Sequence, residues 1–175
     1  MKDWILYEDN HIIIVNKPSK LPVQGDKTGD NTLLDIGKDY IKKIYWAIVK
    51  NKINQNSGEL IHFLKKNRKL NKSFVGQEEQ KGFLKSQLKY KLLKKLNNYF
   101  LYEIELITGR HHQIRAQLSE IGSPIKGDIK YNAKRTNKDG SINLHSRNIK
   151  FIHPIKKTEI SITAPTPNDP IWKSC

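Results

Sequence analysis

Alternating apolar and polar residues near the start of the chain predict strands. WILYEDNHIIIVNKP, residues 4–18, indicates two strands around a polar turn at residues 8–11. The second strand ends at Lys17-Pro18, because proline cannot donate to a strand ladder. LLDIGKDYIKK, residues 33–43, has the spacing of a short helix, and IYWAIV, residues 44–49, is rich in the β-branched and aromatic residues of strands.

The middle of the chain is more polar. Residues 50–82 have few apolar anchors and predict short strands joined by mobile loops. KSQLKYKLLKKL, residues 85–96, and YFLYEIELI, residues 99–107, alternate more regularly. Asn97-Asn98 between them is a good turn, so this pair is expected to form a hairpin.

Strands also close the chain. HSRNIKFIHPI, residues 145–155, and TEISITAP, residues 158–165, are strand-like and joined by the turn KK. A length of 175 residues suits one hydrophobic core. We therefore expect a single α+β domain over residues 1–175, with a mixed, mainly antiparallel sheet flanked by helices.

One amphipathic helix is expected after the hairpin, beginning near residues 108–110. Ile114, Leu118 and Ile121 would share its buried face through their i, i+4, i+7 spacing. Gly122 supplies the C-terminal stop.

The N-terminal end of this helix breaks a local rule. It carries Arg110, His111, His112 and Arg115, although the helix dipole favours acidic residues there. An anion, either a carboxylate or a phosphate, is therefore expected among these side chains. Adjacent histidines point about 100° apart on a helix, so a zinc site is not expected. A solvated basic helix end is the remaining alternative.

The charge balance indicates a polyanionic partner. Lys and Arg number 32 against 17 Asp and Glu, a formal charge of +15, which is typical of proteins that bind nucleic acid or an anionic membrane surface. No apolar run has membrane-spanning length, and the N-terminus lacks the apolar core of a signal peptide, so a cytoplasmic protein is expected. The single cysteine, Cys175, excludes an internal disulfide.

Four ordered motifs resemble the RluA-type RNA pseudouridine synthases. LITGRHHQIRAQLSEIGSPIKGDIKY, residues 106–131, is similar to the family's TGRxHQIR motif followed by G.PI.GD..Y. Residues 6–24, 42–49 and 144–154 resemble its opening NKP segment, its tyrosine strand and its closing strands. The resemblance spans residues 4–172. It implies the pseudouridine synthase catalytic fold and the isomerisation of uridine to pseudouridine in rRNA or tRNA, by a monomer without metal or cofactor.

The resemblance also implies residue roles. Arg115 matches the basic residue that pairs with the catalytic aspartate. Tyr45 matches the tyrosine that lies against the target base and helps to remove the C5 proton, whereas strand alternation turns Trp46 to the other face. The target uridine must leave its stack, which implies a base-flipping pocket. The residues expected to bind phosphates around the RNA-facing cleft are Arg110, His111, Lys17 and Lys126.

The family's most diagnostic element, HRLDxxTSG, is absent from this sequence. In family members a loop, this motif with its catalytic aspartate, a strand and a helix separate the equivalents of LLDIGKDYIK and KKIYWAIV. Here the two segments meet directly around residues 41–44, which indicates an internal deletion. Arg115 would then lack its partner, and we expect it to be exposed or to bind a phosphate.

Three explanations of the deletion stay open. The segment belongs to the protein but is missing from this sequence, or the chain is a deletion variant that binds RNA without catalysing the reaction. In the third, Asp35 or Asp39 has replaced the nucleophile, but both residues fit a solvated helix face, and nothing in LLDIGKDY favours either one.

Overall fold

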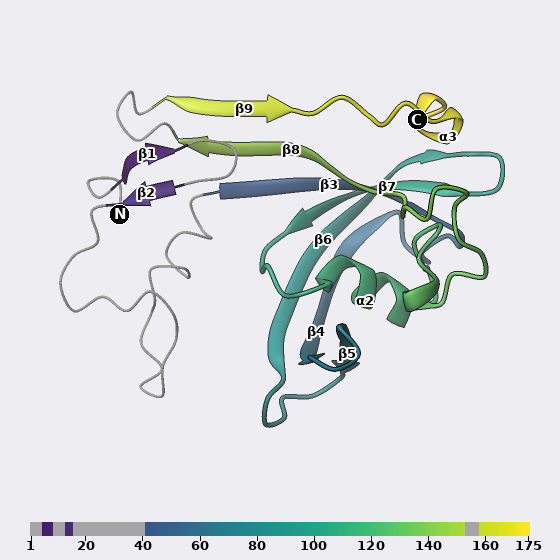
Figure 1. Cartoon of the computed structure of the whole chain (residues 1–175), viewed down its shortest axis with the longest axis horizontal. Helices are drawn as coiled ribbons and strands as arrows, with labels where there is room; N and C mark the ends of the chain where they lie inside the picture. The colour runs from purple at the N-terminus through teal and green to yellow at the C-terminus, as the bar shows by residue number, and fades with distance from the viewer. Residues whose placement is uncertain (1–4, 9–12, 16–40, 153–157) are drawn as a thin grey trace. The chain divides into compact units, whose positions relative to one another are not determined.

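The computed structural model describes residues 5–8, 13–15, 41–152 and 158–175 (Figure 1). The chain divides into two compact units, residues 1–42 with 148–163 and residues 43–147 with 164–175. The expected single domain over the whole chain stays a prediction. The strands are β1 (Ile5–Glu8), β2 (Ile13–Val15), β3 (Ile41–Val49), β4 (Ser57–Asn67), β5 (Lys72–Gly76), β6 (Leu84–Lys95), β7 (Phe100–Leu106), β8 (Leu144–Ile152) and β9 (Glu159–Thr163). The helices are α2 (Gln113–Glu120), the 3₁₀ helix η2 (Ile129–Tyr131) and α3 (Pro170–Lys173).

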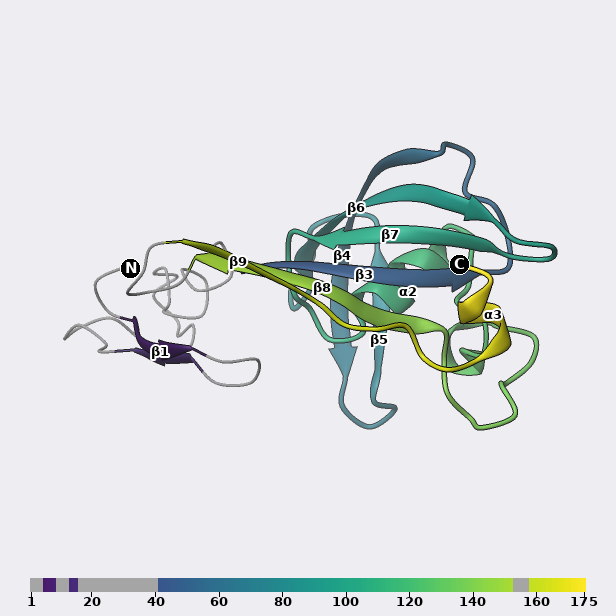
Figure 2. The same cartoon turned by 90° about the horizontal axis from the view of Figure 1, so that it is seen from above.

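Antiparallel strands dominate both units. In the larger unit the strand order is β5-β4-β6-β7-β3, followed by β8, and Figure 2 shows β6, β7 and β3 side by side. The pairs β4–β5, β4–β6, β6–β7 and β3–β7 are antiparallel. In the smaller unit β1 pairs with β2, and β8 pairs with β9 from Asn148 onward, both antiparallel. The predicted α+β class, the early pair of strands and the hairpin around Asn97-Asn98 are confirmed.

β3 separates two hydrophobic clusters by its alternation. Tyr45, Ala47 and Val49 belong to the cluster that also takes up the buried face of α2. Trp46 and Ile48 belong to the cluster around α3. The predicted opposite orientations of neighbouring Tyr45 and Trp46 are therefore confirmed. Complete burial of Ile48 contributes roughly 1.5–3 kcal/mol to folding, so each face of β3 helps to hold this strand in the sheet.

Two segments differ from the predicted elements. β4 is eleven residues long rather than short. It pairs with β5 on one side and β6 on the other, and its inward positions are Leu60, His62 and Leu64, so a polar residue interrupts its apolar pattern. Ile41–Lys43, expected at the end of a helix, begins β3 instead. The rest of that predicted helix lies outside the described residues.

The predicted helix begins later than expected, at Gln113, because His112 has a left-handed backbone with φ of 52°. Its end follows the prediction. Gly122 has φ of 73°, the Ser123 N–H donates to the Leu118 carbonyl at 2.9 Å, and the Gly122 N–H donates to Ser119 at 3.0 Å. This Schellman ending uses the backbone freedom of glycine to stop the helix. No helix in the described part of the chain is long and apolar enough to cross a membrane.

Candidate functional site

A connected polar cluster surrounds Arg115 on α2. Its guanidinium forms a fork with the carboxylate of Asp128, with Nε 2.7 Å from Oδ2 and Nη2 2.7 Å from Oδ1. The Asp128 side chain is fully buried and that of Arg115 is 18% exposed. The hydrogen bond to Asp128 raises the pKa of Arg115, which therefore stays charged. A bidentate pair of this kind fixes the direction of the guanidinium as well as its position.

The expectation that Arg115 lacks a carboxylate partner, and is exposed or bound to phosphate, is wrong. Asp128 lies in the same motif, 13 residues along the chain, and its carboxylate is the anion beside the basic cluster. Sequence reasoning gave Asp128 no role, although GD..Y was quoted as part of the family motif. A carboxylate in a loop has no periodic pattern that reveals its partner.

His112 links this ion pair to Tyr131. Arg115 Nη1 lies 3.0 Å from His112 Nε2, and a guanidinium can only donate, so Nε2 accepts. His112 Nδ1 is then the protonated nitrogen and donates to the Tyr131 hydroxyl at 3.0 Å, which also accepts from the Ser73 N–H at 2.8 Å. Burial, followed by the charge of Arg115, lowers the pKa of His112 to about 4. The imidazole is therefore neutral and serves as a spacer between Arg115 and Tyr131.

His111 stacks on His112, with ring centroids 3.8 Å apart. Both histidines precede the helix, so the predicted divergence of their side chains on a helix is wrong. The ring nitrogens of His111 contact Ser73 Oγ and Asn71 Oδ1, each at 3.0 Å, and its pKa is lowered by burial and by nearby cations. These contacts attach the loop to β5. No group of three potential metal-ligating side chains occurs in the part of the chain that the structure describes, and a site without metal stays a prediction.

Gln113 holds the loop that precedes the helix. Its Oε1 accepts from the Thr108 hydroxyl at 2.8 Å and from the Arg110 N–H at 2.9 Å, while Nε2 donates to the Gln87 carbonyl at 3.0 Å. Arg110 also donates from Nε to the Lys85 carbonyl at 3.2 Å. The motif TGRHHQIR thus forms a loop anchored on β6, which explains its many polar side chains.

Tyr45 lies elsewhere in the larger unit. It is half-buried against the main core cluster and stands opposite Ile104 of β7. Within the described residues, no contact between Tyr45 and Arg115 is present. Lys17 lies outside the described residues. Proximity of Tyr45, Arg115 and Lys17 in one catalytic cleft stays a prediction.

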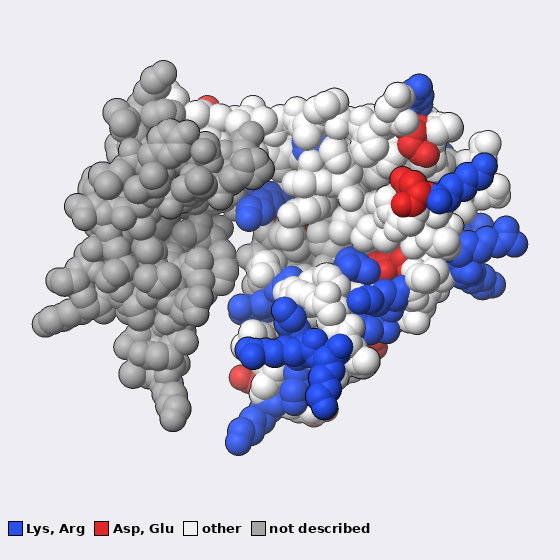
Figure 3. Space-filling model, viewed as in Figure 1, with Lys and Arg blue, Asp and Glu red and all other residues white. Residues whose placement is uncertain are grey.

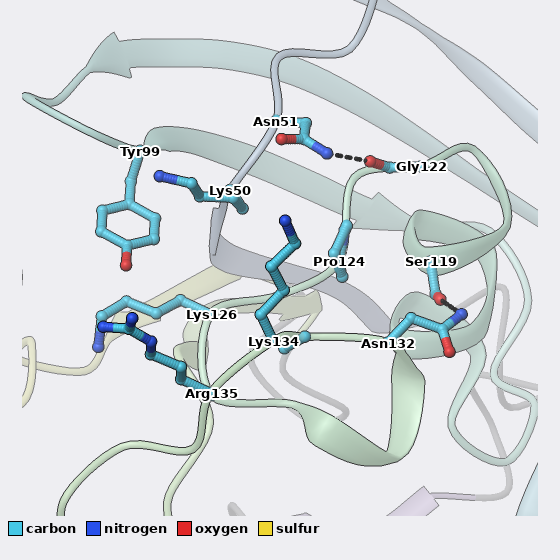
Figure 4. A pocket seen from close by; sticks show the side chains of 12 residues that line it. Lys50, Asn51, Tyr99, Ser119, Gly122, Pro124, Lys126, Asn132, Lys134 and Arg135 are labelled. Carbon is cyan, nitrogen blue, oxygen red and sulfur yellow. Dashed lines mark hydrogen bonds between the residues drawn. The ribbon is translucent and has the colours of Figure 1, made fainter.

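Lys126 lines a pocket separate from the Arg115 cluster (Figure 4). Its ammonium donates to Asn137 Oδ1 and, at 3.3 Å, to Asn143 Oδ1. The structure therefore groups Arg110, His111 and Arg115 in one loop and helix, and places Lys126 in a pocket of its own.

Positive charge gathers on one part of the described surface, in the region of β4, β5 and α2 (Figure 3). Such a surface attracts polyanions and raises their rate of encounter. The exposed cations of β4, β5 and the turns beside them include Lys65, Lys66, Arg68, Lys69 and Lys81.

Comparison with known proteins identifies the family. The sequence pattern of the family described as RNA pseudouridylate synthase matches residues 31–120. The chain is 30% identical over 209 positions to the ribosomal large subunit pseudouridine synthase C of Rickettsia felis, covering 94% of this chain and 68% of the relative. The protein of the same name from Rickettsia prowazekii is 29% identical, with 95% and 69% covered. The chain belongs to the RNA pseudouridylate synthase family, as its motifs predict.

Solved structures agree on the fold. Human RNA pseudouridylate synthase domain containing 1 superposes with a TM-score of 0.62 at 19% identity, over 80% of this chain and 60% of the solved chain. Human RNA pseudouridylate synthase domain containing 4 gives 0.62 at 20% identity, over 77% and 61%. This chain thus spans about three fifths of the length of these solved chains.

The sequence alignments also bear on the internal deletion. The alignment with the Rickettsia prowazekii protein covers 211 positions, whereas this chain has 175 residues. The difference, 211 − 175, means that at least 36 aligned positions have no residue in this chain.

Proposed function

We propose that this protein is an RNA pseudouridine synthase that isomerises uridine to pseudouridine, with ribosomal RNA as its first substrate and tRNA as its second. The observation that carries the proposal is the family motif with Arg115 held in a fixed direction by Asp128. The names of the relatives, which refer to the ribosomal large subunit, support ribosomal RNA. We expect a cytoplasmic monomer that needs neither metal nor cofactor.

Arg115 is proposed to orient the reacting groups. Three of its N–H donors are used by Asp128 and His112. A guanidinium carries further N–H donors, which leaves some for a carboxylate or for the target nucleotide. Tyr45 is proposed to lie against the flipped base, where its ring supplies a stacking wall. The proposed phosphate-binding residues are Arg110, His111, Lys17 and Lys126.

A second candidate function is RNA binding without turnover. One specific observation favours it, because the motif with the nucleophilic aspartate is absent and the alignment leaves at least 36 positions of a relative unmatched. If the chain is active, its carboxylate must come from another segment, and Asp35 and Asp39 are the candidates next to the junction. Substitution of each by Asn tests them separately.

The experiment that separates the two functions measures tritium release from RNA labelled at uridine C5. Turnover releases the label, whereas binding alone only changes the mobility of the RNA in a salt-dependent way. Arg115→Ala should abolish release, and unchanged release would overturn the assigned role. Arg115→Lys is the matched variant, since it keeps the charge but loses the fork to Asp128 and should also be strongly impaired.

Mass spectrometry of the protein from its natural host tests the junction. A chain continuous as written gives a peptide that runs from Asp39 through Tyr45. If that peptide is missing and residues 41–44 are preceded by other sequence, the deletion belongs to this sequence and not to the protein.

A further inference from the structure

A basic pocket of about 680 Å³ lies beside the turn between β6 and β7 (Figure 4). Four of its lining side chains are cationic, from three separate parts of the chain, and none is a carboxylate. Tyr99 supplies its aromatic wall. The four cations are Lys50, Lys126, Lys134 and Arg135.

The cations are arranged around Tyr99. The ammonium groups of Lys50 and Lys126 lie 5.0 and 5.9 Å from the centre of the Tyr99 ring. Lys126 is held further by Asn137 and Asn143. These contacts fix two positive charges at the wall without neutralising either.

Lys134 and Arg135 are the free cations of this pocket. Both are exposed, and the structure shows no ion pair or hydrogen bond for either side chain within the described residues. Figure 4 shows the Lys134 ammonium directed into the space between Lys50 and Pro124. Four cations without a lining carboxylate repel one another, so an anion that enters the pocket would relieve this repulsion.

The pocket is distinct from the residues assigned to the reaction. Lys50 follows β3, whereas Tyr45 lies four residues before its last residue, Val49, about 13 Å away along an extended strand. Lys126 and Asp128 belong to one loop, but Lys126 lines this pocket and Asp128 binds Arg115 on α2. A ligand in the pocket would therefore contact the loop that holds the Arg115 cluster without occupying that cluster.

A second pocket extends the basic surface. It lies on the other side of the same hairpin turn, is lined by Lys94, Lys95 and Asn98 among others, and shares Tyr99 with the first. The Lys50 ammonium donates to the Asn98 carbonyl at 3.3 Å and so stands between the two pockets. Positive charge thus continues across the turn, as a chain of phosphates requires and a single small anion does not.

We propose that the Lys50–Lys126–Lys134–Arg135 pocket binds phosphates of the RNA backbone outside the target nucleotide, and that the strand continues past Tyr99 toward Lys94 and Lys95. This inference rests on the proposed function, because it takes RNA as the substrate. Its role is to position the substrate RNA. The residues touch phosphates only and read no base.

The test compares two double variants that remove the same charge. Lys134→Gln/Arg135→Gln removes the two free cations of the pocket. Lys89→Gln/Lys91→Gln removes two exposed lysines of β6 that stand opposite Glu105 and Glu103 and line neither pocket. Binding of a substrate RNA is titrated at several salt concentrations for the wild type and both variants, with thermal unfolding as a check of folding.

The pocket variant should bind RNA more weakly than the control. Each lost phosphate contact should make the slope of log K against log salt shallower by about 0.7 for single-stranded and about 0.9 for duplex RNA, so two contacts should change it by roughly 1.4 to 1.8. The control should keep the slope of the wild type, because its lysines are already opposite carboxylates.

The failures are distinguishable. A wild type that binds no RNA overturns the proposed function together with this inference. A wild type that binds RNA, with equal slopes for the two variants, overturns the pocket and leaves the proposed function standing. Titration with inorganic phosphate gives a third outcome. Saturable phosphate binding that only the pocket variant loses, with RNA binding unchanged, would assign the pocket to a free anion and overturn the inference.

Discussion

Arg115 and Asp128 form a two-point ion pair, with both N···O distances at 2.7 Å and with the carboxylate fully buried. The pair joins the two halves of the family motif, since Arg115 belongs to α2 and Asp128 to the loop that leads into η2. It therefore fixes the orientation of an arginine on which the proposed reaction depends, and it also secures the loop that carries Lys126.

Substitution Asp128→Asn should destabilise the protein by roughly 3 kcal/mol, because it leaves the half-buried Arg115 charge without its counter-charge. The measurement is urea unfolding at neutral pH. Glu79→Gln, in an exposed loop, removes one negative charge as a control and should leave the midpoint near that of the wild type. Equal midpoints for the two variants would mean that the ion pair contributes little.

Gly127→Ala should also destabilise the protein, for a steric reason. Gly127 has φ of 88°, and an added Cβ would lie 2.6 Å from the Ser141 carbonyl oxygen and 2.8 Å from Asn137 Nδ2. Strain of this kind costs roughly 1–3 kcal/mol. Gly140→Ala is the matched control, since it has φ of 74° but nothing within 4 Å of the added Cβ. The free energy of unfolding should fall more for Gly127→Ala, and a larger loss for Gly140→Ala would contradict the close approach.

The stability of the protein should depend on pH through His112. Its pKa falls from 6.5 in the unfolded chain to about 4 in the folded protein. Between these values the unfolded chain binds a proton that the folded protein does not, so this contribution is fully present above about pH 6.5 and is lost as the pH falls toward 4.

The variant His112→Asn isolates this effect, because asparagine tolerates the left-handed backbone and does not titrate. Its free energy of unfolding should decrease less than that of the wild type between pH 6.5 and 4. Part of the pH dependence should persist, since the pKa values of His62 and His111 are also lowered. An unchanged pH dependence would show that His112 is protonated in the folded state.

The elements that the sequence predicted well are those whose burial follows a simple period. β3 and β7 alternate apolar and polar residues, and both were predicted as strands. β4 was underestimated because His62 takes one inward position, where Gln117 of α2 contacts its Nδ1 at 3.1 Å. A residue on another element supplies the polar partner, and no local pattern reveals it.

The site was predictable in its residue types but not in its connections. Arg115 and His111 were selected because basic residues at a helix start are unusual, and the structure places a buried carboxylate beside Arg115. Its identity as Asp128 could not be predicted, since the contact depends on how a loop returns to the helix. The late helix start at Gln113 follows from the positive φ of His112, which residue preference does not indicate for histidine followed by an amphipathic segment.

The central claim is that this chain catalyses uridine isomerisation in RNA, and tritium release from C5-labelled ribosomal RNA tests it most directly. The proposed function predicts release by the wild type and none by Arg115→Ala. Bound RNA that retains all its tritium with the wild type would contradict the claim and leave a protein that binds RNA without modifying it.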